Sequence, residues 1–208
     1  MSADIRIAAI IPVAAIEGAK TRLGESLDAE ERRDLVERLL ARTLDAVLAV
    51  ERLTDVLVVS PDREVLALAA QAGARTLRQR TSGLNAGAAE ARDDVIAGGA
   101  EAVVVLPIDL PFITPEAVDE VVKGLDNGAT VVVLAPDRHG TGTNALALRP
   151  PAVIAFAFGV GSRAAHRAAA AQAGATYREV DGPLAVDLDT PDDLVFVESI
   201  RPEHLRVS

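Results

Sequence analysis

The sequence predicts an α/β fold in which two layers of helices enclose a mostly parallel mixed sheet. Three observations support this three-layer α/β/α arrangement. Apolar runs alternate with amphipathic segments through most of the 208 residues, which is typical of βαβ units. The first apolar run, residues 6–12, stands at the very start of the chain. Two runs, 129–134 and 143–148, follow each other without a helix between them, which predicts one antiparallel element.

The strands are predicted from short runs rich in β-branched and apolar residues, bounded by glycine, proline or polar residues. In chain order these are residues 6–12, 55–60, 74–77, 101–106, 129–134, 143–148 and 176–180. A further extended strand is predicted within residues 184–191, where apolar and acidic residues alternate.

The helices are predicted from the 3.6-residue spacing of apolar side chains and from capping signals. Thr114 followed by Pro115 begins one of them, because threonine is favoured at the N-cap and proline at the first helical position. The other helices are predicted at residues 28–50, 61–73, 84–97, 160–174 and 192–199. No repeat or linker divides the chain, so we expect a single domain over residues 1–208.

Composition excludes several classes of function. A formal net charge of −10 offers no electrostatic footprint for nucleic acid or an anionic membrane. The absence of cysteine excludes disulfides and thiolate chemistry. No apolar run approaches the roughly 20 residues of a membrane span, and no signal-peptide pattern is present. We therefore expect a cytoplasmic enzyme or binding protein.

Two acidic segments at predicted strand ends carry the most information about function. Asp109 ends one apolar run, and Asp187 and Asp189 share a face of the extended segment. Ligands of α/β sheets bind at the carboxyl ends of strands, and three carboxylates there would suit Mg²⁺. Two alternatives stay open: Asp109 as a turn residue that accepts backbone N–H groups, and Asp189 or Thr190 as the cap of the last helix.

The loop after the first strand contains Lys20 and Arg22. This is where many nucleotide-binding α/β folds hold phosphate, although neither common glycine-rich phosphate motif is present. Lys20 is one of only two lysines, which favours a function over the alternative of a solvated surface loop.

A third candidate region combines glycines, hydroxyls and a histidine. Ser162 is predicted as an N-cap, where free N–H groups can bind a carboxylate or phosphate; a plain helix cap is the alternative. His166 lies one helical turn further on. It either overhangs the same pocket or is a plain surface histidine, which is the simpler expectation. Residues 140–144 form either a binding loop or an ordinary hairpin connection.

Seven segments in this order carry a resemblance to a known family. They are residues 19–23 (AKTRL), 58–62 (VVSPD), 83–86 (GLNA), 108–111 (IDLP), 142–146 (GTNAL), 158–166 (FGVGSRAAH) and 186–194 (VDLDTPDDL). The chain resembles the guanylyltransferases that make the activated precursor of the deazaflavin coenzyme F-420, known as 2-phospho-L-lactate or phosphoenolpyruvate guanylyltransferases.

The resemblance implies a nucleoside-diphospho-sugar-transferase-like (Rossmann-like) fold related to the molybdenum-cofactor guanylyltransferases. It also implies transfer of GMP from GTP to the phosphate of a small phosphorylated three-carbon acid, with release of pyrophosphate. The family often has a lysine soon after the first strand, where this chain has Val13, Ala14 and Ala15.

Three sets of site residues carry over by motif. The carboxylate of the acid would be held by Thr143, Gly159 and Ser162. The Mg²⁺ ion would be held by Asp109, Asp187 and Asp189. The nucleotide would contact Lys20, Arg22, Ser60, Asp62, Leu84 and Asn85. Of these residues, Asp109, Lys20 and Arg22 are the expected catalytic ones.

The sequence leaves several questions open. The acid is phosphoenolpyruvate, 2-phospholactate or 3-phosphoglycerate; the arginine-rich, lysine-poor composition is associated with high-GC bacteria and favours phosphoenolpyruvate. A homodimer and a monomer are both compatible with the sequence. The alternative functions are a molybdopterin guanylyltransferase or sugar-phosphate cytidylyltransferase of the same fold, and a non-catalytic nucleotide-binding protein.

Overall fold

A seven-stranded sheet forms the middle layer of the computed structural model, which describes residues 5–16 and 27–200. The strand order is β3-β2-β1-β4-β6-β5-β7. The strands are β1 (Ile7–Pro12), β2 (Leu53–Ser60), β3 (Arg75–Arg78), β4 (Ala102–Val105), β5 (Val131–Pro136), β6 (Thr143–Arg149) and β7 (Thr176–Glu179). β6 is antiparallel to both of its neighbours, whereas the other strand pairs are parallel. The predicted α/β class and the antiparallel element are therefore confirmed.

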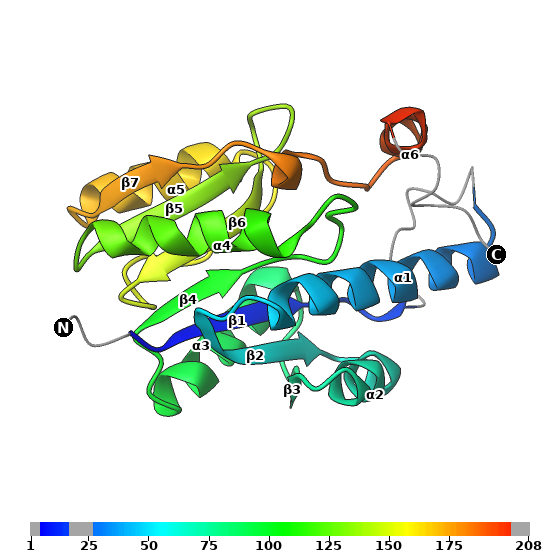
Figure 1. Ribbon diagram of the computed structural model, residues 1–208, viewed down its shortest axis with the longest axis horizontal. Helices are drawn as coiled ribbons and strands as arrows, with labels where there is room; N and C mark the ends of the chain where they lie inside the picture. The colour runs from blue at the N-terminus through cyan, green and yellow to red at the C-terminus, as the bar shows by residue number, and fades with distance from the viewer. Residues whose placement is uncertain (1–4, 17–26, 201–208) are drawn as a thin grey trace.

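Six α-helices pack around this sheet within the two described ranges. They are α1 (Ala29–Leu48), α2 (Arg63–Gln71), α3 (Leu84–Ala97), α4 (Pro115–Lys123), α5 (Ser162–Gln172) and α6 (Pro191–Ile200), accompanied by the short 3₁₀ helices η3 (Gly124–Asn127) and η4 (Pro183–Ala185). Helices α1, α2 and α4 bury apolar side chains against one face of the sheet, and α3 and α5 against the other (Figure 1). None of these helices combines the length and hydropathy that a membrane span needs.

The central strand and the helix starts follow from their local sequence. All six residues of β1 are buried, as expected for a strand covered on both faces. α1 begins with a capping box, in which the Asp28 carboxylate accepts from the backbone of Glu31 and the Glu31 side chain accepts from the backbone of Asp28. α4 begins as predicted, with the Thr114 hydroxyl accepting from the N–H of Ala117 and Pro115 as first residue.

A register shift marks the start of β6. Ala145 lies opposite Ala135, but Thr143 lies opposite Pro136, so Asn144 is one extra residue on this strand. Such a bulge changes which face of the sheet the preceding side chain meets. Ala145 belongs to the core on the α1 and α4 side, whereas the Thr143 hydroxyl contacts side chains of α5.

The prediction of a strand within residues 184–191 is wrong. The segment forms η4 and then an irregular stretch up to α6. The reason lies elsewhere in the sheet: β4 is already paired on both sides, and β7 takes the edge position beside β5. The segment therefore crosses the end of the sheet. There Leu188 packs with Leu35 and Leu39 of α1 and Val197 of α6, in a small cluster of its own.

Helix α6 lies beyond the ends of β1, β2, β5 and β7, apart from the two main helical layers (Figure 1). It is joined to the body through the Leu188 cluster and through the stretch between η4 and α6. That stretch carries Asp187 and Asp189, so the predicted acidic residues lie at the carboxyl end of the sheet even though they are not on a strand.

Candidate active site

An acidic cluster lies where β4 ends. The N–H of Leu188 donates to the backbone oxygen of Asp109 over 2.9 Å, which holds the 186–190 segment against the loop after β4. Asp187 is thereby brought close enough to Asp109, Asp189 and Asp193 for their charges to act on it. Burial first, and then the charges of Asp109, Asp189 and Asp193, raise the pKa of the Asp187 carboxyl. The two acidic segments predicted from the sequence therefore meet in space.

Asp187 is the residue of this cluster that most needs a ligand. Its Oδ1 atom is buried and has no hydrogen-bond partner in the part of the chain that the structure describes. A buried carboxylate oxygen without a partner is costly, and neighbouring carboxylates add to the cost. A divalent cation would relieve both effects, so this donor set fits Mg²⁺ chemically. Among residues 5–16 and 27–200, however, no three carboxylate or imidazole groups are already gathered as a complete metal site.

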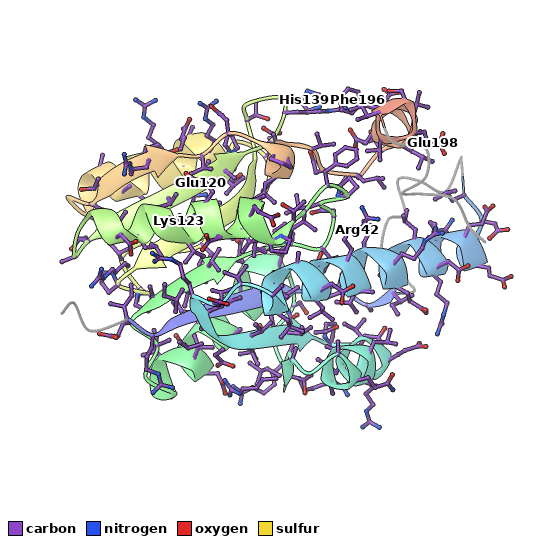
Figure 2. The ribbon with its side chains drawn as sticks, in the orientation of Figure 1. Arg42, Glu120, Lys123, His139, Phe196 and Glu198 are labelled. Carbon is purple, nitrogen blue, oxygen red and sulfur yellow. The ribbon has the colours of Figure 1, made fainter. Side chains whose placement is uncertain are left out.

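Asp193, a residue that the sequence analysis did not select, fixes the position of this segment. Its carboxylate accepts from the N–H groups of Asp189 (3.0 Å) and Thr190 (2.8 Å) and from the Thr190 hydroxyl (2.8 Å), and it pairs with Arg138. Burial raises the pKa of Asp193, but the hydrogen bonds from Thr190 and Asp189 and the charge of Arg138 outweigh it and lower the pKa. The Arg138 guanidinium in turn lies 4.6 Å from the centre of the Phe196 ring of α6. Figure 2 shows Phe196 and the neighbouring loop residue His139 at this edge.

The cap of α6 is made by Thr190. Its hydroxyl accepts from the N–H of Asp193 over 3.3 Å, while the Asp193 carboxylate accepts from the N–H of Thr190. Of the two caps that the sequence left open, the threonine is the one in place. The Thr190-x-x-Asp193 spacing is a capping signal, and it could have identified Asp193 from the sequence.

A second cluster is formed by hydroxyl and imidazole groups on β6 and α5. The Ser162 hydroxyl lies 3.0 Å from the Thr143 hydroxyl, which lies 3.1 Å from Nδ1 of His166. The other ring nitrogen, Nε2, accepts from the N–H of Ala157 over 3.0 Å. All three side chains are buried, and burial lowers the pKa of His166 to about 4, so the ring is neutral at neutral pH.

Two expectations for this region are wrong. Gly161, not Ser162, is the N-cap of α5, and no side chain caps this helix. Gly161 has a φ of 74°, in the left-handed region that glycine adopts without strain, and this turn frees Ser162 to point at Thr143. His166 is not a surface histidine, since none of it is exposed.

Gly159 lies in the same turn as the Ser162 hydroxyl. It accepts from the N–H of Ser162 over 3.1 Å and has a φ of 125°. A Cβ atom here would meet nothing within 4 Å, so the backbone angle and not crowding favours glycine. The structure thus brings Thr143, Gly159 and Ser162 together, as the motif predicted.

The predicted nucleotide-binding residues divide into three groups. Lys20 and Arg22 lie outside the described residues. Ser60 and Asp62 are engaged at the start of α2: the Ser60 hydroxyl accepts from the N–H of Asp62, and the Asp62 carboxylate accepts from Glu64 and, over 3.0 Å, from the N–H of Ile16.

Leu84 and Asn85 form the first turn of α3. Leu84 is exposed, whereas the Asn85 amide makes two hydrogen bonds with the backbone of Phe158, one as donor (3.0 Å) and one as acceptor (2.8 Å). Asn85 therefore supports the turn that carries Gly159. No motif in the sequence predicts this connection.

A cavity of about 460 Å³ lies elsewhere, between α1 and the loop after β4. Arg38, Arg42 and Pro111 are among its lining residues, and Arg42 donates to the backbone oxygen of Pro111 (Figure 2). Within the part of the chain that the structure describes, none of the predicted site residues lines this cavity.

Solved structures of several enzymes share this fold. A protein from Desulfovibrio desulfuricans G20, named as a nucleotide-diphospho-sugar transferase, has a TM-score of 0.77 at 18% identity, covering 98% of this chain and 91% of that one. A 4-diphosphocytidyl-2C-methyl-D-erythritol synthase from Anaerococcus prevotii has a TM-score of 0.66 at 12% identity, covering 95% and 96%. Glucosyl-3-phosphoglycerate synthase from Mycobacterium tuberculosis, solved with Mn²⁺, has a TM-score of 0.62 at 14% identity, covering 98% and 80%. The fold is that of nucleotidyltransferases and related nucleotide-sugar enzymes.

Relatives by sequence define the family within this class. Phosphoenolpyruvate guanylyltransferases from Sphaerobacter thermophilus and Rubrobacter xylanophilus are 46% and 42% identical to this chain, over 89% and 92% of it and 89% and 93% of their own lengths. A 2-phospho-L-lactate guanylyltransferase from Methanocaldococcus jannaschii is 32% identical, over 93% of this chain and 83% of its own. The family model described as "Guanylyl transferase CofC like" matches residues 7–198. The chain belongs to this family of guanylyltransferases and is a GTP-dependent nucleotidyltransferase.

Proposed function

We propose that this enzyme transfers GMP from GTP to the phosphate of phosphoenolpyruvate and releases pyrophosphate, as a step in coenzyme F-420 biosynthesis. The proposal depends above all on the neutral cluster of Thr143, Ser162 and His166, because a buried hydroxyl pair at a helix start suits the carboxylate of a small acid. The phosphoenolpyruvate names of the bacterial relatives support this acid over 2-phospholactate.

The reaction needs no general base. A phosphate monoester is largely ionised near neutral pH, because its second pKa is about 6. One of its oxygens attacks the α-phosphorus of GTP, a new P–O bond forms, the bond from the α-phosphorus to the β-phosphate oxygen breaks, and pyrophosphate leaves. His166 is poorly suited to act as a base, because its Nε2 lone pair already accepts from the N–H of Ala157 and burial lowers its pKa to about 4. Catalysis therefore depends on positioning and on neutralising charge.

The acidic cluster is the proposed metal site. Asp187 and Asp109, together with Asp189, would hold Mg²⁺, with phosphate oxygens or water completing its ligands. When bound, the ion neutralises charge on the phosphates during transfer. Asp193 keeps the 187–190 segment in place by accepting three hydrogen bonds from Asp189 and Thr190.

The predicted basic loop completes the proposal. Lys20 would act as a point charge and Arg22 as a two-pronged donor along the triphosphate. The Asp62 carboxylate holds the N–H of Ile16, directly before this loop in the chain, so Asp62 would set where the loop begins.

The decisive experiment offers GTP and Mg²⁺ with one acid at a time and follows pyrophosphate release and the mass of the product. We expect rapid release with phosphoenolpyruvate and slower release with 2-phospholactate and 3-phosphoglycerate. Faster release with another acid would replace phosphoenolpyruvate as substrate. Release only with molybdopterin or a sugar phosphate, or binding of GTP without any release, would overturn the proposal in favour of the two alternative functions.

A further inference from the structure

We propose that His166 is a positioning residue, which sets the direction of the hydroxyl protons of Thr143 and Ser162 so that this pair offers one hydrogen-bond donor to the carboxylate of the acid substrate. The inference rests on the proposed function for the identity of the ligand. The direction of the protons follows from contacts within the protein alone.

The backbone of Ala157 fixes the tautomer of the ring. Its N–H donates to Nε2 of His166 over 3.0 Å, so Nε2 must carry a lone pair and no proton. A neutral imidazole then has its proton on Nδ1. Nδ1 lies 3.1 Å from the Thr143 hydroxyl, so the ring donates to Thr143 and cannot accept from it.

The proton count of the two hydroxyls follows from this. Thr143 and Ser162 bring two hydroxyl protons, and one of them lies between the two oxygens, which are 3.0 Å apart. His166 accepts neither, because its Nδ1 is already a donor. One hydroxyl proton is left without an acceptor in the contacts that the structure describes, and it remains available for a ligand oxygen. If the Ser162 hydroxyl donates to Thr143, both lone pairs of the Thr143 oxygen are filled, and Thr143 can act on a ligand only as a donor.

The ring is held against rotation. None of His166 is exposed, and the Phe158 ring packs edge-on against it at 5.3 Å with an interplanar angle of 73°. Phe158 is itself fixed by the two hydrogen bonds of Asn85. A half-turn of the imidazole would put carbon atoms in place of both nitrogens and lose the bonds to Thr143 and Ala157 together. The donor direction is therefore built in before any ligand arrives.

This arrangement selects a ligand atom that accepts a hydrogen bond. A carboxylate oxygen only accepts hydrogen bonds, so it matches a donor that has no other acceptor. An amide N–H or an ammonium group in the same place would meet a second donor, because neither has a lone pair to accept the bond. Because the imidazole is neutral, the cluster recognises the acid by hydrogen bonding, and the positive charges that the substrates need must come from elsewhere.

Two substitutions separate this role from simple packing. In His166→Gln the side-chain oxygen can still accept from Ala157, but the donor to Thr143 is lost. In His166→Asn the amide nitrogen can still donate to Thr143, but the acceptor for Ala157 is lost. We expect H166Q to raise KM for the acid about tenfold or more while KM for GTP stays unchanged. We expect H166N to restore part of this loss.

Outcomes of the opposite kind overturn the proposal. If both variants raise both KM values together, or if H166Q and H166N are equally impaired, His166 is a packing residue. Gln172→Ala, at the exposed end of the same helix, is the matched control and should leave kcat, KM for the acid and KM for GTP unchanged.

A measurement on the unaltered protein keeps the proposal testable if the variants do not fold. Nitrogen NMR of histidine-labelled enzyme distinguishes the two neutral tautomers, and the chain has only three histidines to resolve. We expect His166 to carry its proton on Nδ1 at pH 7, and a proton on Nε2 or on both nitrogens would overturn the proposal. This spectrum does not depend on turnover. An Nδ1 proton together with no transfer to any acid would therefore reject the proposed function and leave the proton direction standing.

Discussion

The two clusters at the carboxyl end of the sheet differ in how complete they are without a ligand. In the cluster of Thr143, Ser162 and His166, all groups are uncharged, buried and hydrogen-bonded to each other or to backbone. In the cluster around Asp187, like charges lie close together and a buried oxygen has no partner in the described chain. The first cluster is preorganised by the protein, whereas the second, in the proposed function, is completed by a bound cation.

Under the proposed function, this difference divides recognition of the substrates between the two clusters. A preorganised neutral cluster costs little when it binds its ligand, because nothing has to be rearranged. A cluster of carboxylates stays unfavourable until a cation reaches it, so its stability should depend on metal in a way that the neutral cluster does not. Four predictions test this contrast, from the largest expected effect to the smallest.

The largest effect is expected for Asp187→Asn. Removing this charge should lower turnover about 100-fold or more, because charge neutralisation at the phosphates is lost. The melting temperature in the absence of metal should not fall, since a repelling carboxylate has been removed. Mg²⁺ should raise the melting temperature of the wild type but not that of the variant, as differential scanning fluorimetry would measure. Asp192→Asn, on the exposed first turn of α6, is the matched control. Wild-type turnover in D187N would remove Asp187 from the site.

The next effect is expected for Asp193→Asn, which tests whether the acidic segment is held by Asp193. The substitution breaks the ion pair between the buried Asp193 carboxylate and the partly exposed Arg138, and it weakens three hydrogen bonds. The free energy of unfolding should therefore fall by about 3 kcal/mol. Unlike D187N, this variant should lose stability and turnover together, in denaturant melts and in the pyrophosphate assay. A stable variant with normal turnover would show that the segment is held by other contacts.

The third prediction concerns acid and tests the neutral cluster. The folded-state pKa of His166 is lowered to about 4, below its unfolded value, so the unfolded chain binds the proton first as pH falls. The stability from keeping the ring neutral is fully present above pH 6.5 and declines towards pH 4. The free energy of unfolding of the wild type should therefore fall by about 2 kcal/mol between pH 7 and pH 5. Denaturant melts at the two pH values should show a smaller loss of stability in H166N than in the wild type. An equal loss in both proteins would contradict the lowered pKa of His166.

The smallest effect is expected for Asn85→Ala, which tests which cluster Asn85 serves. Loss of its two hydrogen bonds to Phe158 should lower the free energy of unfolding by about 1–2 kcal/mol. Because the turn next to Gly159 is loosened, KM for the acid should rise more than KM for GTP. The reverse result, a rise in KM for GTP alone, would favour the nucleotide role that the sequence predicted for Asn85. Asn85→Asp is the matched control, since it keeps the acceptor for the N–H of Phe158.

The parts of the fold that depend on local pattern could be predicted from the sequence. The helix predicted at residues 84–97 matches α3, and the back-to-back runs near 129–134 and 143–148 form the antiparallel pair β5 and β6. The strand predicted within 184–191 failed for a non-local reason. Alternation makes a segment suitable for a sheet, but pairing also needs a free edge, and the sheet offers none beside β4.

The candidate site could be predicted in its membership but not in its internal contacts. The motifs selected Thr143, Ser162 and Asp187, which the structure places in two clusters. The supporting contacts of Asn85 with Phe158 and of His166 with Ala157 involve backbone groups, and backbone groups leave no mark in the sequence. Asp193 is different, because its place in the first turn of the last helix and its spacing from Thr190 are visible in the sequence.

The extra residue in β6 has a consequence for how this chain can change. The loop between β5 and β6 lies at the surface, where insertions are generally tolerated. Asn144 is not such a place, because it decides whether Thr143 belongs to the layer of α5 or to the layer of α1 and α4. Deleting this single residue would return the strand to regular alternation and turn Thr143 away from Ser162. The proposed recognition of the acid would then be lost through a shift in strand register, although Thr143, Gly159 and Ser162 would all still be present in the sequence.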